Sequence, residues 1–122
     1  MTNTATARPG RTTTTHYVGQ VVIATDQHHT ASPGRPHLVV AVQGEHVYLA
    51  ELTHAEQGAW RTDELPTASH DYSYLALVDW RTREWRPQWH HTATTRRYRR
   101  QLSRATAAQA VAYVDRAYQA RR

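Results

Sequence analysis

The stretch that most constrains the fold is residues 35–53, RPHLVVAVQGEHVYLAELT, which combines dense apolar content with a turn in its middle. Residues 38–42 and 46–52 are two apolar runs, with the composition and length of buried β-strands. Between them lies Gln43-Gly44-Glu45, whose glycine can adopt the positive φ that a tight connection needs. The stretch therefore predicts an antiparallel hairpin, around which the rest of the chain packs.

Shorter apolar segments on both sides of this hairpin predict further strands. They are residues 17–25, 60–62, 72–80 and 83–89, of which 72–80, YSYLALVDW, is the strongest. The polar segment 26–34, DQHHTASPG, predicts a loop of a length that is often functional. Short strands separated by turns, with no helix between them, favour a small antiparallel barrel.

The C-terminal part changes to a helical period. Thr106 and Gln109 have the spacing of a capping box, and Val111, Val114 and Tyr118 then share one face of a helix. The predicted fold class is therefore mainly β (α+β), a small antiparallel barrel with an amphipathic helix over 106–120. Its predicted parts are a disordered Thr-rich tail at 1–15, a barrel domain at 16–92, and a basic connector with the C-terminal helix at 93–122.

Composition narrows the classes of function. The 122 residues suit one domain, and without Cys there is neither a disulfide framework nor a thiolate site. Residues 1–92 carry seven Arg against nine acidic residues, whereas residues 93–122 carry eight Arg against Asp115 alone. This basic segment predicts an anionic partner, either nucleic acid or an acidic protein. No segment is apolar enough for a membrane span, which predicts a cytoplasmic protein without a membrane partner.

Three segments resemble the PemK/MazF family of toxin ribonucleases. Residues 19–22, GQVV, are similar to the family's opening G-D-I-V, residues 34–40, GRPHLVV, to its G-R-R-P-A-L-V-V, and residues 49–53, LAELT, to its strand ending in P-I/L-T. Residues 73–82 resemble S-Y-V-L-L-D-Q-V-R-T less closely, because Asp79 lies six residues after Ser73 rather than five and Trp80 replaces the usual Gln. The resemblance covers about residues 17–90 and implies an SH3-like barrel.

This resemblance also implies an activity and a set of partners. Members of the family are homodimeric endoribonucleases that cleave single-stranded RNA and are neutralised by an antitoxin, here expected to be acidic. By resemblance Arg35 would contact the scissile phosphate and Thr53 would help to position it. Such cleavage uses the 2′-OH of the RNA as nucleophile and needs a base, an acid and a charge-stabilising cation, with no metal or cofactor. The alternative is that Arg35 is a loop charge and Thr53 a strand-end hydroxyl.

Further candidates come from residue types and their spacing. Asp79 and Arg81 alternate on the expected strand and would project to one face as a base and a cation, or else form only a surface ion pair. His28 in the long loop is a possible acid or base. The paired His at 28–29 and 90–91 do not have a metal-binding pattern, so no metal is expected.

Four Trp residues with Arg among them suit single-stranded nucleic acid, because bases stack on exposed rings while guanidinium groups hold phosphates. Structurally, at least two of these Trp residues are expected to pack in the core or in a dimer interface. The competing hypothesis to the ribonuclease is a non-catalytic SH3-like barrel that binds nucleic acid or joins an assembly through its basic segment. The predicted nucleic-acid contacts, besides His28, are Arg83, Arg86, Arg96, Arg97, Arg99 and Arg100.

Overall fold

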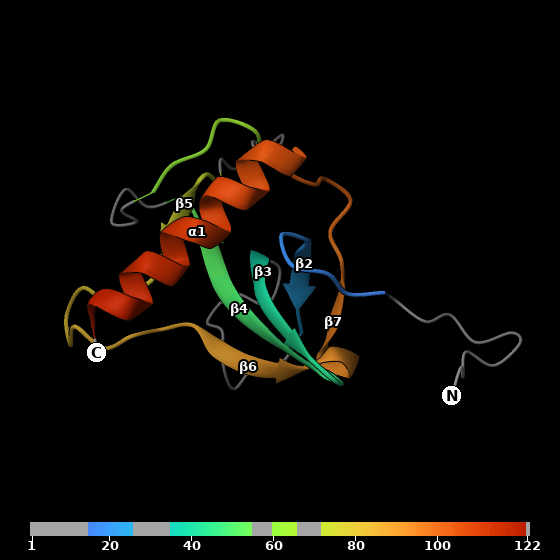
Figure 1. Ribbon diagram of the computed structural model, residues 1–122, viewed down its shortest axis with the longest axis horizontal. Coiled ribbons are helices and arrows are strands. Elements are labelled where there is room, and N and C mark those ends of the chain that lie inside the picture. The colour runs from blue at the N-terminus through green and yellow to red at the C-terminus, as the bar shows by residue number, and fades with distance from the viewer. Residues whose placement is uncertain (1–14, 26–34, 55–59, 66–71, 122) are drawn as a thin grey trace, which may run out of the picture.

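One curved antiparallel sheet and a single long helix make up the fold (Figure 1). The computed structural model describes residues 15–25, 35–54, 60–65 and 72–121. The six-stranded sheet has the order β5-β4-β3-β2-β7, and β6 pairs with β4 as well. The elements are β2 (Val21–Ala24), β3 (Pro36–Gln43), β4 (His46–Thr53), β5 (Tyr74–Ala76), β6 (Gln88–His91), the 3₁₀ turn η1 (Thr92–Thr94), β7 (Thr95–Arg97) and α1 (Arg104–Ala120).

The predicted central hairpin is confirmed as β3 and β4. Gln43 pairs with His46, so the turn consists of Gly44 and Glu45. Gly44 has a φ of 60°, the left-handed value that a two-residue hairpin turn requires at its first position. The register runs on to His37 opposite Glu51, with a shift between Val39 and Ala41. On its other edge β4 pairs with two strands, with β6 along its first half and with β5 along its second half.

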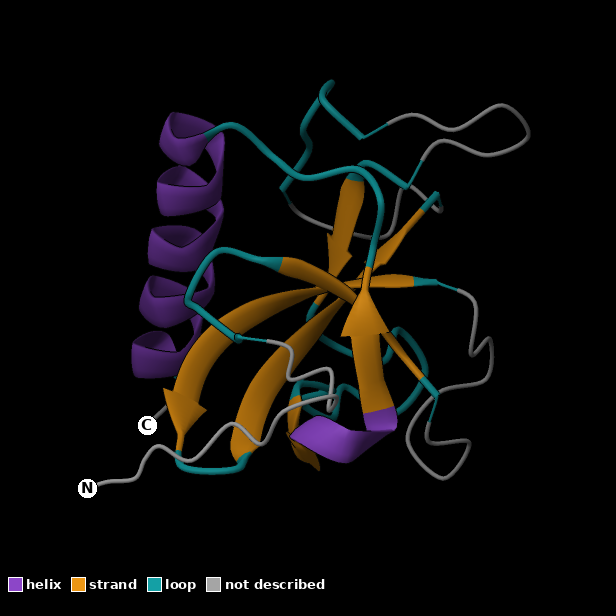
Figure 2. Ribbon diagram, turned by 90° about the vertical axis from the view of Figure 1, so that its right-hand side faces the viewer, coloured by secondary structure: helices purple, strands orange, loops and turns teal. Residues whose placement is uncertain are grey.

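The two faces of the sheet bury separate apolar clusters. On β4, Val47 and Leu49 point to one face, while Ala50 and Leu52 point to the other, as strand alternation requires. The first cluster is completed by Val22, Ala24 and Val39 from β2 and β3. The second lies beneath α1, which packs as a separate layer beside the strands (Figure 2). Its main members are Val21, Leu38, Ala50, Leu52, Leu75, Leu102, Ala107, Ala110 and Val114.

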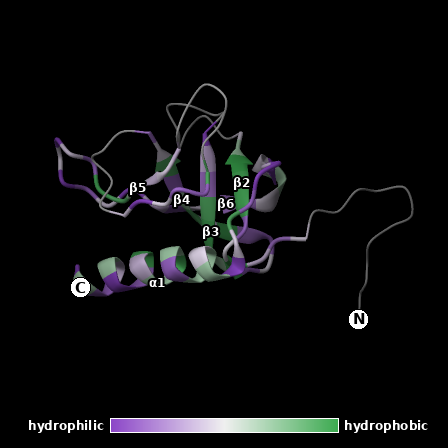
Figure 3. Ribbon diagram, turned by 90° about the horizontal axis from the view of Figure 1, so that it is seen from above, coloured by the Kyte–Doolittle hydropathy of each residue, from purple (hydrophilic) through white to green (hydrophobic). Residues whose placement is uncertain are grey.

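The C-terminal helix is confirmed, although it begins two residues earlier than predicted. Ser103, not Thr106, is the N-cap, and its Oγ accepts a hydrogen bond from the N–H of Thr106 at 3.2 Å. Val114 is only 1% exposed, as predicted, but the buried side of the helix is formed by Ala107, Ala110 and Val114 rather than by Val111, Val114 and Tyr118. Tyr118 is 44% exposed, and its ring lies 5.8 Å from that of Trp85. Viewed from above, α1 runs along one side of the strands (Figure 3).

The turn before β2 lies directly against this helix. Gly19 has a φ of 96°, and a Cβ at this position would stand 3.1 Å from the Cβ of Ala107. Both the backbone conformation and the close approach therefore require glycine here. Strand β2 begins only at Val21, so the first strand is shorter than the predicted 17–25.

Three predictions about strands and boundaries are corrected. Residues 72–80 do not form one strand, because β5 ends at Ala76 and is followed only by an isolated bridge between Val78 and Trp85. The sheet also continues past residue 92, since β7 pairs with β2. Residues 60–62 contribute a bridge from Arg61 to Tyr74 rather than a strand. The predicted tail and the 26–34 loop, with His28, lie outside the described residues except for Thr15.

Within the described part of the chain, no helix combines the length and apolarity that crossing a membrane would need.

Candidate functional site

A buried carboxylate held between two arginines marks the candidate site. Glu51 on β4 is 6% exposed, and its two oxygens accept from different guanidinium groups. Arg35 Nη1 lies 2.5 Å from Glu51 Oε2, and Arg86 Nη2 lies 2.7 Å from Oε1. Two cations share one anion, so the cluster keeps a net charge of +1. A carboxylate this deeply buried requires such partners, because an unpaired buried charge is strongly unfavourable.

The same two arginines line a cleft of about 200 Å³. Arg35 precedes β3, Thr53 ends β4, and Ala76 ends β5. The register explains why they meet, because Glu51 pairs with Ala76 on one side and with His37 on the other. The carboxyl end of β4 therefore collects side chains from three neighbouring segments. The lining residues are Arg35, Thr53, His54, Ala76, Val78, Trp80 and Arg86.

His37 contacts the backbone of Arg35 beside the Arg35–Glu51–Arg86 ion pairs. Its Nδ1 lies 2.9 Å from the backbone carbonyl oxygen of Arg35, which can only accept, so Nδ1 carries the proton and donates it. Burial lowers the pKa of His37, and the neighbouring Glu51 carboxylate opposes this effect only in part. The imidazole is therefore neutral at pH 7 and fixes the backbone of Arg35 without adding a third positive charge.

A tight turn brings an exposed tryptophan to the rim of the cleft. The Asp79 carboxylate accepts hydrogen bonds from the backbone N–H groups of Arg81 at 2.8 Å and Thr82 at 3.1 Å. These bonds, that from Thr82 first, lower the pKa of Asp79. The Asp79 N–H donates to the Glu84 carbonyl at 2.9 Å and the Arg83 N–H to the Asp79 carbonyl at 2.8 Å, which closes the turn, and Arg83 takes a φ of 62° within it. Trp80, at the start of this turn, is 60% exposed.

The structure brings together some of the predicted site residues and separates others. Arg35, Thr53 and Arg86 line one cleft, although 51 residues of sequence separate the first from the last. Asp79 and Arg81 do not project from a strand as predicted, because both lie in the turn that carries Trp80. The Arg81 guanidinium stacks on the Trp80 ring, 5.0 Å from its centroid.

The remaining predicted residues lie away from the cleft-lining set. The backbone carbonyl of Arg83 accepts from Arg121 of the helix at 3.4 Å. Arg96 and Arg97 are exposed on β7, and Arg99 and Arg100 follow it, also exposed. The Arg100 side chain donates to the carbonyl of Glu64 at 3.3 Å. The basic segment is thus a separate surface. His28 lies outside the described residues.

Sequence reasoning did not single out Glu51, His37, His54 or Trp80 as site residues. Glu51 carried a detectable signal, since it is a carboxylate at a position where strand alternation continues the apolar face of Val47 and Leu49. Trp80 was noted only as one of four Trp residues whose mix with Arg suits single-stranded nucleic acid, and its place at the cleft depends on where β5 ends. His54 follows Thr53 directly, and its ring lies 6.1 Å from that of Tyr72.

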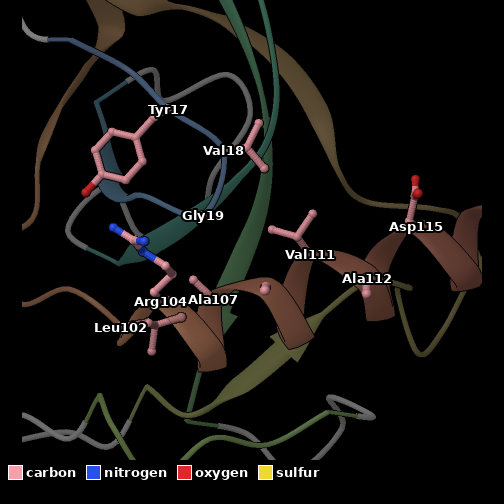
Figure 4. Close-up of a pocket in the computed structure, with 10 residues that line it drawn as sticks. Tyr17, Val18, Gly19, Leu102, Arg104, Ala107, Val111, Ala112 and Asp115 are labelled. Carbon is pink, nitrogen blue, oxygen red and sulfur yellow. The ribbon is translucent and has the colours of Figure 1, made fainter.

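A larger, more apolar cavity is lined by none of the residues of this cleft. It has a volume of about 750 Å³ between the 17–19 turn and α1, where Tyr17 and Val18 face the helix residues Ala107 and Val111 (Figure 4). Its charged lining residues are Arg104 and Asp115, one of each sign. Among the described residues, no group of three or more His, Cys, Asp or Glu is arranged to hold a metal ion. Because two cations line the Arg35–Arg86 cleft, whereas the charges that line the larger cavity are of opposite sign, the cleft is the better candidate for an anionic ligand.

Comparisons with known proteins find no matching family model, no matching curated protein and no matching solved structure.

Proposed function

We propose that the chain is a metal-independent endoribonuclease that cleaves single-stranded RNA, with the Arg35–Arg86 cleft as its active site. The observation that carries this proposal is the meeting of Arg35 and Thr53 in one cleft. These are the two residues to which the resemblance to the PemK/MazF toxins gives catalytic roles. Their convergence depends on the strand register and is not a consequence of the local motifs.

The charge of the cleft suits a phosphate group. Each guanidinium carries five N–H donors, and its bond to Glu51 uses one nitrogen, so the same cation can also face a phosphate oxygen. Glu51 fixes both side chains before substrate arrives, which reduces the reorganisation needed at the moment of reaction. Arg35 is 25% exposed and Arg86 35% exposed, so both reach solvent from a largely buried anchor. The pair would stabilise the charge that develops on a phosphorane.

The proposed reaction needs only the RNA, this cleft and solvent water. The 2′-oxygen attacks the adjacent phosphorus, a new O2′–P bond forms, and the P–O5′ bond breaks to leave a 2′,3′-cyclic phosphate. His54, which lines the cleft, is the group proposed to take the proton of the 2′-OH. The released 5′-oxygen takes up a proton from water. The Thr53 hydroxyl positions the phosphate between the cations.

Cleavage in the presence of EDTA tests this proposal. Purified protein should cut single-stranded RNA and leave 2′,3′-cyclic phosphate ends. Arg35→Ala should lower the rate on the order of 10²-fold, because losing one charge-stabilising donor typically costs about 3 kcal/mol of transition-state stabilisation. Thr53→Val should cost less, since it removes only a hydroxyl. Arg116→Ala is the matched control, because Arg116 is exposed on α1 and is not a lining residue of the cleft.

Arg35→Ala also removes one partner of a buried carboxylate, so its melting temperature must be measured alongside its rate. Arg35→Lys separates the two effects, because it keeps a positive charge near Glu51 but loses the planar fork that grips a phosphate. We expect a folded Arg35→Lys protein with a reduced rate. If the wild type leaves RNAs of varied sequence intact while still binding them, the enzyme proposal fails. A nucleic-acid-binding barrel that uses the exposed Arg96–Arg100 segment would then be the better explanation.

We also propose the partners that the resemblance implies, a second copy of the chain and an acidic antitoxin in a cytoplasmic toxin-antitoxin pair. The net charge of +5 supports an acidic partner. The mass of the purified protein in solution checks the homodimer, and a monomeric mass at micromolar concentration would exclude it.

A further inference from the structure

Trp80 is a large apolar side chain exposed at the rim of a charged cleft. Its 60% exposure is the highest among the exposed large apolar side chains of the described residues. It lines the same 200 Å³ cleft as Arg35 and Arg86. Trp60 and Trp85 are half-buried against the core beneath α1, and Trp89 is exposed but is not a lining residue of the cleft. Trp80 therefore differs from the other three in facing the candidate phosphate site from an exposed position.

We infer that Trp80 is a stacking platform for one unpaired base of the RNA, whose neighbouring phosphate is held by Arg35 and Arg86. The inference rests on the proposed function and adds a base-binding subsite to it. Base–aromatic stacking is a common way for proteins to bind single strands, and it tolerates different bases because each has a π-face. Arg35 and Arg86, which we call the phosphate clamp, would bind the phosphate of a nucleotide, and the Trp80 indole in the same cleft would bind its base.

The turn around Trp80 holds the indole in place before any ligand binds. Asp79 accepts hydrogen bonds from two backbone N–H groups of the turn, and the bridge between Val78 and Trp85 closes its base. The Arg81 guanidinium covers the indole at 5.0 Å. An indole has two faces, so a base can stack on the one opposite Arg81. A platform fixed in this way loses little conformational freedom on binding.

This arrangement also sets the class of substrate. The bases of a duplex are paired and stacked on each other, so a base reaches an external ring only from a single strand, a loop or a flipped position. A cleft that combined cations with only polar side chains would bind the backbone of either form. Trp80 therefore selects for single-stranded RNA at the site of cleavage.

Binding measured with 2′-O-methyl RNA tests the inference without cleavage, because the methyl group blocks attack by the 2′-oxygen. Three probes of equal length are compared: a base-bearing single strand, an abasic ribose-phosphate strand of the same charge, and the same sequence in a duplex, which carries the phosphates of two strands. The wild type should bind the base-bearing strand roughly 5- to 150-fold more tightly than the abasic strand, the range expected for stacking of one base. It should also bind that strand more tightly than the duplex.

Trp80→Ala should remove this difference and leave abasic binding unchanged, whereas Trp80→Phe should keep most of it. Trp89→Ala is the matched control, because Trp89 is an exposed tryptophan on β6 that does not line the cleft. This variant should behave as the wild type does. Melting temperatures accompany each variant, and Trp80→Phe preserves the test if Trp80→Ala is unstable. A Trp80→Ala protein that still prefers the base-bearing strand overturns the inference.

Failure of the proposed function gives a different result. The abasic strand reports the phosphate site alone, so unchanged abasic binding in Arg35→Ala contradicts the phosphate clamp whatever Trp80 does. Equal binding of base-bearing and abasic strands by a wild type that loses both in Arg35→Ala overturns only the stacking platform.

Discussion

At the scale of the residue, the site is organised by charge burial at one end of β4. Glu51 lies on the apolar face of the sheet, where an unpaired carboxylate would be strongly disfavoured. Arg35 and Arg86 satisfy it and are in turn held at the edge of the cleft. The buried anion is thus best explained as a positioning residue for two cations.

His37 gives this cluster a measurable dependence on pH. Because burial lowers its pKa in the folded state, the unfolded chain binds a proton more readily below about pH 6.5. The stabilisation from the neutral imidazole is complete above that pH and is lost as the pH falls toward the folded-state pKa. We expect the melting temperature to fall between pH 7.5 and pH 5, with His37 contributing to the drop.

His37→Asn isolates that contribution, because the Asn amide can still donate to the Arg35 carbonyl but does not titrate. The variant is expected to be less stable overall, since the side chain is smaller. The decisive quantity is the difference in melting temperature between the two pH values, which should be smaller in His37→Asn than in the wild type. Equal differences in the two proteins would show that His37 does not carry the pH dependence.

Only part of the site could be predicted from single residues. Arg35 and Thr53 were identified through the resemblance, and Arg86 was assigned only to general nucleic-acid contact. Their meeting with Glu51 depends on which residues pair across three strands, and a sequence pattern does not specify that register. The sequence indicated that exposed tryptophans suit base stacking, but which of the four Trp residues lies at the cleft depends on the same pairing of strands.

At the scale of the element, the central hairpin was predictable and the 79–84 turn was not. Residues 38–42 and 46–52 are apolar runs on either side of a glycine turn, so local and tertiary preferences agree in β3 and β4. In residues 72–80 the apolar run reads as a strand through Trp80, but the Asp79 carboxylate bonds to the backbone two and three residues later. Such local side-chain bonds compete with strand pairing and end it. The hypothesis of Asp79 as a base depended on that strand.

Two substitutions distinguish the turn-forming role of Asp79 from a role as base. Asp79→Asn keeps an oxygen that accepts from the Arg81 and Thr82 N–H groups but cannot take a proton at neutral pH. We expect it to retain near-wild-type RNA cleavage. Asp79→Ala removes the acceptor, loosens the turn and moves Trp80, so RNA binding should weaken severalfold. Cleavage abolished in Asp79→Asn with binding intact would instead support the base role.

At the scale of the whole molecule, the packing of the helix on the sheet follows from the change of hydrophobic period along the chain. The helical face through Val114 was predictable because it repeats at helical spacing, and its burial beneath the sheet confirms that pattern. The start of α1 at Arg104 was not predicted. The Ser103 cap also depends on Glu64, whose carboxylate accepts hydrogen bonds from both the N–H and the Oγ of Ser103. Contacts 39 residues apart leave no local signal.

The uneven charge of the molecule makes the basic segment a second candidate surface for an anionic partner. Arg96, Arg97, Arg99 and Arg100 are exposed on and after β7 and are not lining residues of the cleft. If they contact phosphates, replacing all four with Gln should weaken binding and flatten the dependence of log K on log salt concentration. Each lost contact to a single strand should reduce the slope by about 0.7. The preference for base-bearing over abasic strands should stay, because we attribute it to Trp80 in the cleft.

Arg116→Gln is the control for a single lost charge elsewhere. An unchanged salt slope in the fourfold variant would remove this segment from the interface and leave the cleft as the binding site for RNA.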